Sequence, residues 1–194
     1  QTLDAMEERQ QGKGLTGVST GFRDIDKLTS GLQKGNLIII GARPSVGKTS
    51  FGLNIATHVA TVSNHPALIF SLEMSRLELT QRILCAEARV DSQKIVNAQM
   101  NDDDWVRINK GIGHLDEAPI YIDDNPGVSI MEIRAKARRL KSRIGNLGII
   151  VVDYLQLMTG RSTAESRQVE ISEISRGLKL LARDLETPVI GISQ

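Results

Sequence analysis

The chain has 194 residues, of which 40% are hydrophobic and 24% are charged, and its formal net charge at pH 7 is +1. These values are ordinary for one globular domain and exclude a disordered chain or a globally basic nucleic-acid binder. Aromatic residues make up only 3% of the chain, which argues against a platform that stacks nucleic-acid bases. The single cysteine fits a reducing compartment. No apolar run reaches the length of about 18 residues that a membrane helix needs, so we expect no membrane contact.

Residues 1–15 are polar and rich in glutamine, and they include the sequence Gly12-Lys13-Gly14. We predict a linker or docking helix here, followed by one domain over residues 16–194. The start of this domain is loop-rich, but Phe22, Ile25 and Leu28 recur at three-residue intervals and predict a short helix.

Residues 37–49 combine a short apolar strand, a loop of small residues and the start of a helix. From Ala42 to Thr49 the loop reads Ala-Arg-Pro-Ser-Val-Gly-Lys-Thr, which has the spacing of a Walker A phosphate-binding loop. That pattern ordinarily begins with glycine, whereas here Ala42 takes the first position and Gly41 precedes it. The alternative is a turn that binds nothing, and the complete pattern between a strand and a helix disfavours it.

Each residue type in this loop suits a nucleoside triphosphate such as ATP, bound with Mg²⁺. Gly47 lets backbone N–H groups approach phosphate oxygens, and the helix that follows presents N–H donors and a positive dipole end. Lys48 supplies a positive charge for the terminal phosphates, and Thr49 offers an oxygen ligand to Mg²⁺. We expect nucleotide contacts from the whole loop: Ala42, Arg43, Pro44, Ser45, Val46, Gly47, Lys48, Thr49 and Ser50.

A second buried strand is predicted at residues 67–70. Ser75 and Glu78 form a capping box, so a helix is expected to begin there and to run to about residue 88. Glu73 lies between this strand and this helix, where functional side chains of open α/β sheets gather. We interpret Glu73 as the base that orients and polarises the attacking water in ATP hydrolysis. The alternative is that Glu73 only helps to cap the helix.

Residues 91–116 are predicted to form two helices, and Asn101 with the three acids after it is interpreted as a helix cap rather than a metal site. A strand at 119–122 and a turn lead to a second capping box, Ser129 with Glu132. The helix predicted at residues 130–144 carries six lysines and arginines. This basic face could contact nucleic acid or a neighbouring subunit, but we favour a solvated helix face.

Residues 147–152 are a nearly continuous apolar strand that ends at Asp153, as in a Walker B strand. A carboxylate at this position can orient Mg²⁺ or its bound water beside Thr49.

A long amphipathic helix is predicted at residues 171–185. A last strand at 189–192 ends close to Gln194, whose amide could sense the terminal phosphate. Alternating strands and helices predict an α/β fold with a mainly parallel sheet and helices on both faces.

Six stretches of the sequence resemble the RecA-like motor domain of the DnaB-type replicative DNA helicases. They are residues 16–22 (Thr-Gly-Val-Ser-Thr-Gly-Phe), 41–49 (Gly-Ala-Arg-Pro-Ser-Val-Gly-Lys-Thr), 70–74 (Phe-Ser-Leu-Glu-Met), 152–158 (Val-Asp-Tyr-Leu-Gln-Leu-Met), 173–176 (Glu-Ile-Ser-Arg) and 189–194 (Val-Ile-Gly-Ile-Ser-Gln). Their combination is far more specific than a Walker A loop alone, and alanine at position 42 is also what this family has.

The resemblance implies a RecA-like P-loop NTPase core that hydrolyses ATP with Mg²⁺. Lys48 and Thr49 resemble the phosphate-binding lysine and the Mg²⁺-binding hydroxyl of the family. Glu73 resembles its catalytic glutamate, and Asp153 resembles its Walker B acid. Gln194 resembles the glutamine that links the terminal phosphate to the DNA-binding elements.

Further implications of the resemblance concern the nucleotide and the assembly. Arg82 resembles a family arginine that contacts the nucleotide. The family forms homohexameric rings with ATP at subunit interfaces and single-stranded DNA in the central channel, in the bacterial cytoplasm at replication forks of the nucleoid. Primase and a helicase loader would be further partners, through regions partly outside this chain. The family's trans-acting arginine and main DNA-binding loop follow the position of Gln194, so we expect this chain not to unwind DNA by itself.

The sequence therefore leads us to expect the motor domain of an ATP-dependent replicative helicase, which translocates on single-stranded DNA and unwinds duplex. Two other interpretations stay open at this stage. One is an assembly module that binds nucleotide without turnover. The other is a RecA-like ATPase without helicase activity, such as a recombinase or a clock-type ATPase.

Overall fold

The computed structural model describes residues 15–43, 45–153 and 167–193. The strands are β1 (Leu37–Gly41), β2 (Ala67–Ser71), β3 (Ile120–Asp123), β4 (Ile149–Asp153) and β5 (Val189–Ser193). The helices are α2 (Arg23–Thr29), α3 (Lys48–Thr61), α4 (Arg76–Ala88), α5 (Ser92–Val96), α6 (Asp102–Asp116), α7 (Ile130–Ile144) and α8 (Arg167–Asp184). Each strand and helix predicted within these residues is present, and the predicted and observed ends differ by a few residues at most.

The five described strands lie in the order β1-β5-β4-β2-β3, and every neighbouring pair is parallel. The predicted α/β class with a mainly parallel sheet is therefore confirmed. The register sets Gly41, at the end of β1, beside Ser193 at the end of β5. It also sets Asp153, at the end of β4, beside Ser71 at the end of β2. These strand ends form one side of the sheet, which we call the carboxyl edge; the side where the strands begin is the amino edge.

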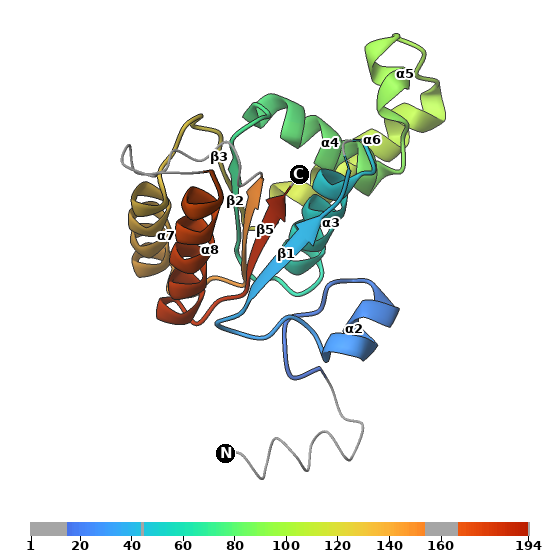
Figure 1. Cartoon of the computed structure of the whole chain (residues 1–194). Helices are drawn as coiled ribbons and strands as arrows, with labels where there is room; N and C mark the ends of the chain where they lie inside the picture. The colour runs from blue at the N-terminus through green and yellow to red at the C-terminus, as the bar shows by residue number, and fades with distance from the viewer. Residues whose placement is uncertain (1–14, 44, 154–166, 194) are drawn as a thin grey trace.

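Helices cover both faces of the sheet, with α7 and α8 on one face and α3 and α4 on the other (Figure 1). Because successive side chains of a strand point to opposite faces, the unbroken apolar run of β4 supplies both cores. Ile150 and Val152 belong to the core under α7 and α8, while Ile149 and Val151 belong to the core under α3. Within the described residues, no helix has the length and apolar character needed to cross a membrane.

Three of the described helices begin with a capping box, in which two side chains close open backbone N–H groups of the first turn. The predicted capping boxes at Ser75 and Ser129 are both present. A third box starts α6, where the Asn101 side chain accepts from the backbone N–H of Asp104 at 2.8 Å. The buried Asp104 carboxylate also receives Lys94 Nζ at 2.9 Å, which ties α5 to α6. The interpretation of this acidic stretch as a helix cap is confirmed.

The helix predicted around residues 22–28 is present as α2, but its apolar residues do not mark its buried side. Leu28 is 88% exposed, whereas Asp26 is only 8% exposed. The Asp26 carboxylate can be buried because it accepts hydrogen bonds from the backbone N–H and hydroxyl of Thr20 and from the hydroxyl of Ser19. Polar contacts with the preceding loop, rather than apolar spacing, therefore orient this short helix.

The basic face of α7 is largely used for contacts within the molecule. Arg134 and Arg138 both donate to Asp184 Oδ2, at 3.0 and 2.6 Å. Lys136 Nζ lies 2.6 Å from Asp123 Oδ2. These ion pairs hold α7 against the end of α8 and the end of β3, so three of its six cations have carboxylate partners among the described residues.

Candidate nucleotide-binding site

The loop between β1 and α3 has the backbone shape of a phosphate cradle. Gly47 and Ser45 adopt left-handed conformations, with φ of 94° and 65°. Such turns direct successive backbone N–H groups toward one point, where an anion binds. Among the described residues, a Cβ atom added at Gly47 would meet no atom within 4 Å, so glycine is required there by its positive φ. The side of the loop at Gly47 is therefore open to a ligand.

The first turn of α3 is left without a negatively charged partner from its own sequence. Its N-cap is Gly47, which makes no side-chain cap hydrogen bond, and the first turn contains no acid. By contrast, α4, α6 and α7 each begin with a capping box that places a carboxylate on the helix start. The N–H groups and positive dipole end of α3 are thus available to an external anion.

Lys48 and Thr49 open α3 at the carboxyl edge of the sheet. Lys48 is 9% exposed, so its charge lies largely within the protein surface. The Thr49 side chain lies close enough to the Asp153 carboxyl group to lower its pKa, and the charge of Lys48 also lowers that pKa. The loop residues and the end of β4 therefore belong to one site.

Asp153 is a buried carboxyl group with an incomplete set of partners. It is 2% exposed, and its Oδ1 atom has no hydrogen-bond partner among the described residues. The pKa of Asp153 is raised, and burial is the largest cause. The nearby Thr49 side chain lowers this pKa, the negative charge of Glu73 raises it further, and the positive charge of Lys48 lowers it. A buried oxygen without a partner calls for a ligand that can satisfy it. A cation or a cation-bound water is such a ligand.

Glu73 lies in the short connection between β2 and α4, as the sequence indicated, and its side chain is exposed. The cap of α4 is made by Ser75 and Glu78, which hydrogen-bond each other's backbone N–H groups. Within the described residues, Glu73 takes no part in that cap. Its charge raises the pKa of Asp153, which places Glu73 on the same side of the sheet as the phosphate loop. The geometry therefore favours the interpretation as a site residue over the interpretation as a cap.

Arg82, on α4, lies close enough to Asp153 for its positive charge to lower the pKa of that carboxyl group. It lines a cavity of about 370 Å³ between α3 and α4, and Ser50 of the phosphate loop lines the same cavity.

Of the other loop residues, Ala42 is half-buried, and the exposed ones are Arg43, Ser45, Val46 and Ser50. Pro44 and Gln194 were also predicted at the site and lie outside the described residues.

The DnaB-like helicase C-terminal domain matches this chain over residues 17–194. The chain belongs to this family. The RecA-like P-loop core that the sequence predicted is the fold of these helicase domains.

Individual relatives of this DnaB-like chain are close in sequence and structure. The replicative DNA helicase DnaB of Geobacillus stearothermophilus is 51% identical over 196 residues, covering 100% of this chain and 43% of that relative. The replicative DNA helicase DnaC of Bacillus subtilis (strain 168) is 48% identical over the same shares. A solved DnaB-like replicative helicase, described with its interactions with primase, superposes with a TM-score of 0.91 at 34% identity, covering 100% of this chain and 47% of that chain. The chain spans less than half the length of the curated relatives.

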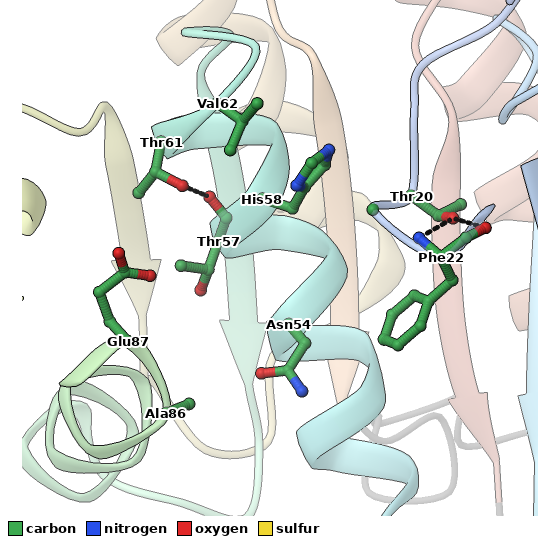
Figure 2. A pocket seen from close by; sticks show the side chains of 10 residues that line it. Thr20, Phe22, Asn54, Thr57, His58, Thr61, Val62, Ala86 and Glu87 are labelled. Carbon is green, nitrogen blue, oxygen red and sulfur yellow. Dashed lines mark hydrogen bonds between the residues drawn. The ribbon is translucent and has the colours of Figure 1, made fainter. Parts of the chain in front are cut away.

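One polar cluster of this DnaB-like domain was not found from the sequence. Figure 2 shows the His58 ring between α3 and the segment that carries Thr20, beside a cavity of about 340 Å³. Ser19 Oγ donates to Asp26 Oδ2 at 2.7 Å and lies 3.3 Å from His58 Nε2. Because a hydroxyl has only one hydrogen, Ser19 must accept from His58, so Nε2 carries the proton. We call Ser19, Asp26 and His58 the clasp cluster, since it holds residues 19–26 on α3.

The sequence spacing of its members does not predict the clasp cluster, because Ser19 lies in a loop, Asp26 in α2 and His58 in α3. The nearest signal was Gly21, which lies within the family-like stretch 16–22. Its φ is 81°, and an added Cβ would lie 2.8 Å from Cγ of His58. A glycine is therefore needed here both for its backbone conformation and for the close approach of the ring.

Proposed function

We propose that this chain is the ATP-hydrolysing motor of a replicative DNA helicase. The observation that carries the proposal is the convergence at the carboxyl edge of the phosphate loop, Asp153 and Glu73. A phosphate cradle alone would support nucleotide binding. A buried acid has an oxygen that lacks a hydrogen-bond partner among the described residues, and an exposed glutamate lies near it; together they add what phosphoryl transfer to water needs.

In this proposal the loop and the first turn of α3 bind the phosphates of ATP through backbone N–H groups, and Lys48 adds a positive charge at the terminal phosphates. The hydroxyl of Thr49 and the free Oδ1 of Asp153 fit Mg²⁺, which prefers oxygen ligands and keeps several waters. Bound there, Mg²⁺ would offset the negative charge of the phosphates during transfer. The raised pKa of Asp153 agrees with a carboxylate that is stabilised once a cation arrives.

Glu73 would orient the attacking water and accept its proton. Its exposure leaves it accessible to a water in the nucleotide cleft. Arg82 would contact the nucleotide from α4. Gln194 would sense the terminal phosphate, and Pro44 would contact it within the loop; both assignments stay predictions from the sequence.

The wider setting is proposed from the relatives. We infer a homohexameric ring with single-stranded DNA in its channel, and primase and a helicase loader as partners, in the cytoplasm of a bacterium at replication forks. One solved relative is described with its interactions with primase. Residues 1–15 would be a linker or docking helix, and residues 16–194 the motor domain.

The decisive experiment separates binding from hydrolysis. Lys48→Ala should remove ATP binding to this chain, measured with a fluorescent ATP analogue, because the charge at the terminal phosphates is lost. Glu73→Gln should bind the analogue normally, yet lower DNA-stimulated ATP hydrolysis by about a hundredfold or more in the full-length protein.

Lys110→Ala is a matched control, since this lysine is exposed on α6 and lies away from the loop. Loss of binding in Glu73→Gln would make Glu73 structural and overturn its assignment. If ATP drives assembly of the full-length protein, seen by gel filtration, without any turnover, the chain is an assembly module and the motor proposal fails.

A further inference from the structure

Two neighbouring cavities lie at the amino edge of the sheet, away from the nucleotide site. Their volumes are about 390 and 600 Å³, within the usual range of ligand pockets. Both are lined by Lys34 and Glu186, so these two side chains stand where the cavities meet. Lys34 precedes β1 and Glu186 precedes β5, which places the pair at the strand beginnings. We call the two cavities together the amino-edge groove.

One end of the amino-edge groove is basic. Lys34, Lys179 and Arg183 line it, and within the described residues none of the three forms an ion pair. Lys179 Nζ donates to the carbonyl oxygen of Gly35 at 2.8 Å and to Oδ1 of Asn36 at 2.9 Å. An ammonium has three N–H donors, so Lys179 is held in place with one donor left for a ligand.

The contrast with α7 shows that this basic end differs from an ordinary charged surface. Arg134 and Arg138 are neutralised by Asp184, the residue next to Arg183 in the chain. Arg183 itself has no carboxylate partner within the described residues, although Asp184 is adjacent. Glu186 is the one carboxylate among the residues that line this end, against three cations. The basic end therefore has a net positive charge and suits an anionic ligand.

The other end of the amino-edge groove is more apolar. Leu15, Val18, Leu147 and Pro188 line it together with polar residues that include Ser63, His65 and Asn146, and Leu15 is 44% exposed. Val18 is fixed by two backbone hydrogen bonds with Leu32, of 2.9 and 2.7 Å, so this wall does not depend on a ligand. The groove thus presents a preformed apolar pocket beside a cluster of cations.

We propose that the amino-edge groove binds a peptide segment of a partner protein that carries acidic side chains next to an apolar one. The acidic groups would bind Lys34, Lys179 and Arg183, and the apolar side chain would enter the pocket beside Leu15. Nucleic acid fits less well, because His65 is the one aromatic ring among the described residues that line the two cavities, and the cations gather at one end of the groove rather than along its length. This function is independent of ATP hydrolysis.

The test uses the full chain and a fluorescein-labelled hexapeptide of two aspartates, two leucines and two glycines, followed by fluorescence anisotropy. Lys34→Glu combined with Arg183→Glu should weaken binding at least tenfold, and added salt should weaken binding to the unmodified chain. Replacing the aspartates of the peptide by asparagine, or its leucines by serine, should each weaken binding. Arg139→Glu, an exposed cation of α7 outside the groove, should bind like the unmodified chain. Binding of the ATP analogue should be the same in all variants, which shows that they fold and keeps this test separate from that of the motor.

Three outcomes would overturn the proposal. The first is equal binding of the acidic peptide by the double variant and the unmodified chain. The second is tighter binding of a labelled ten-nucleotide thymidine strand than of the peptide, if the double variant loses this binding. The groove would then be a nucleic-acid site. Concentration-dependent self-association that the double variant abolishes, without peptide binding, would assign the groove to a second copy and also reject the proposal.

Discussion

Two buried carboxylates lie toward opposite edges of the sheet, and they differ in their hydrogen-bond partners and in the direction of their pKa shifts. Asp153, at the carboxyl edge, is 2% exposed and has an oxygen without a hydrogen-bond partner among the described residues. Asp26, beside the last turns of α3, is 8% exposed and accepts from Thr20 and Ser19. Burial raises the pKa of Asp153. Burial alone would also raise the pKa of Asp26, but the hydrogen bonds and the His58 charge lower it instead.

The number of hydrogen bonds that a buried carboxylate accepts within the protein distinguishes a functional site from a structural contact. A buried carboxylate that the protein has fully satisfied contributes to stability, and it has nothing left to offer a ligand. A buried carboxylate that is only partly satisfied is costly without its ligand and therefore marks a functional position. On this criterion the clasp cluster has a structural role, and Asp153 fits the proposed catalytic site.

The largest expected effect follows from replacing Asp153 by asparagine. Because the folded-state pKa is raised, the unfolded chain ionises more easily, so the charged group lowers the free energy of unfolding at pH values above its ordinary pKa of 3.8. Asp153→Asn should therefore raise the free energy of unfolding by about 1 kcal/mol in urea at pH 7 without nucleotide. In the full-length protein it should lower ATP hydrolysis by about a hundredfold or more.

The opposite changes in stability and activity are what make this variant informative. If Asp153→Asn lowers both, the carboxylate has a structural role and the comparison with Asp26 fails. Unfolding measured with and without Mg²⁺ and ATP adds a second readout. The ligands should stabilise the unmodified chain more than the variant, because only bound ligand satisfies the buried charge.

The next effect concerns the backbone of the phosphate loop. Gly47→Ala should lower the free energy of unfolding by about 1–2 kcal/mol, because alanine is strained at the observed φ of 94°. It should also weaken binding of the ATP analogue about tenfold, a loss of about 1.4 kcal/mol, as the N–H groups leave their common direction.

Gly113 gives a matched control for this change. It lies within α6, is exposed, and an added Cβ would meet no atom within 4 Å. Gly113→Ala should raise the free energy of unfolding by about 0.5–1 kcal/mol and leave nucleotide binding unchanged. Equal effects of the two substitutions would show that the loop does not require its left-handed turn.

The carboxyl edge could be predicted from the sequence because its parts follow local rules. A strand that ends in Asp153, a loop that ends in Lys48 and a connection that holds Glu73 each occur within a few residues. In a parallel sheet all strand ends meet at one edge, so their convergence follows from topology. The capping boxes at Ser75 and Ser129 are equally local, and both helices begin where these boxes indicate.

The amino edge could not be predicted in this way, because its groups come from distant parts of the chain. Lys34 and Lys179 are separated by most of the fold, and no pattern links them. The clasp cluster joins His58 to Ser19 across 39 residues. Apolar periodicity was even misleading for α2, where the exposed Leu28 belongs to the pattern and the buried Asp26 does not.

The smallest effect tests the satisfied carboxylate. Asp26→Asn should lower the free energy of unfolding by about 1 kcal/mol at pH 7, because asparagine accepts the three hydrogen bonds less well. Since the folded-state pKa of Asp26 lies below its ordinary value of 3.8, this contribution is present above that value and is lost as the pH falls through the folded-state pKa. Urea unfolding at pH 7, 5 and 3.5 should show the difference between variant and unmodified chain constant between the first two values and smaller at the last. Asp24→Asn, whose side chain is 94% exposed on the same helix, should change little at any of them. A difference that grows as the pH falls would mean that Asp26 is strained by burial like Asp153, and the two carboxylates would no longer be distinguished by how well the fold satisfies them.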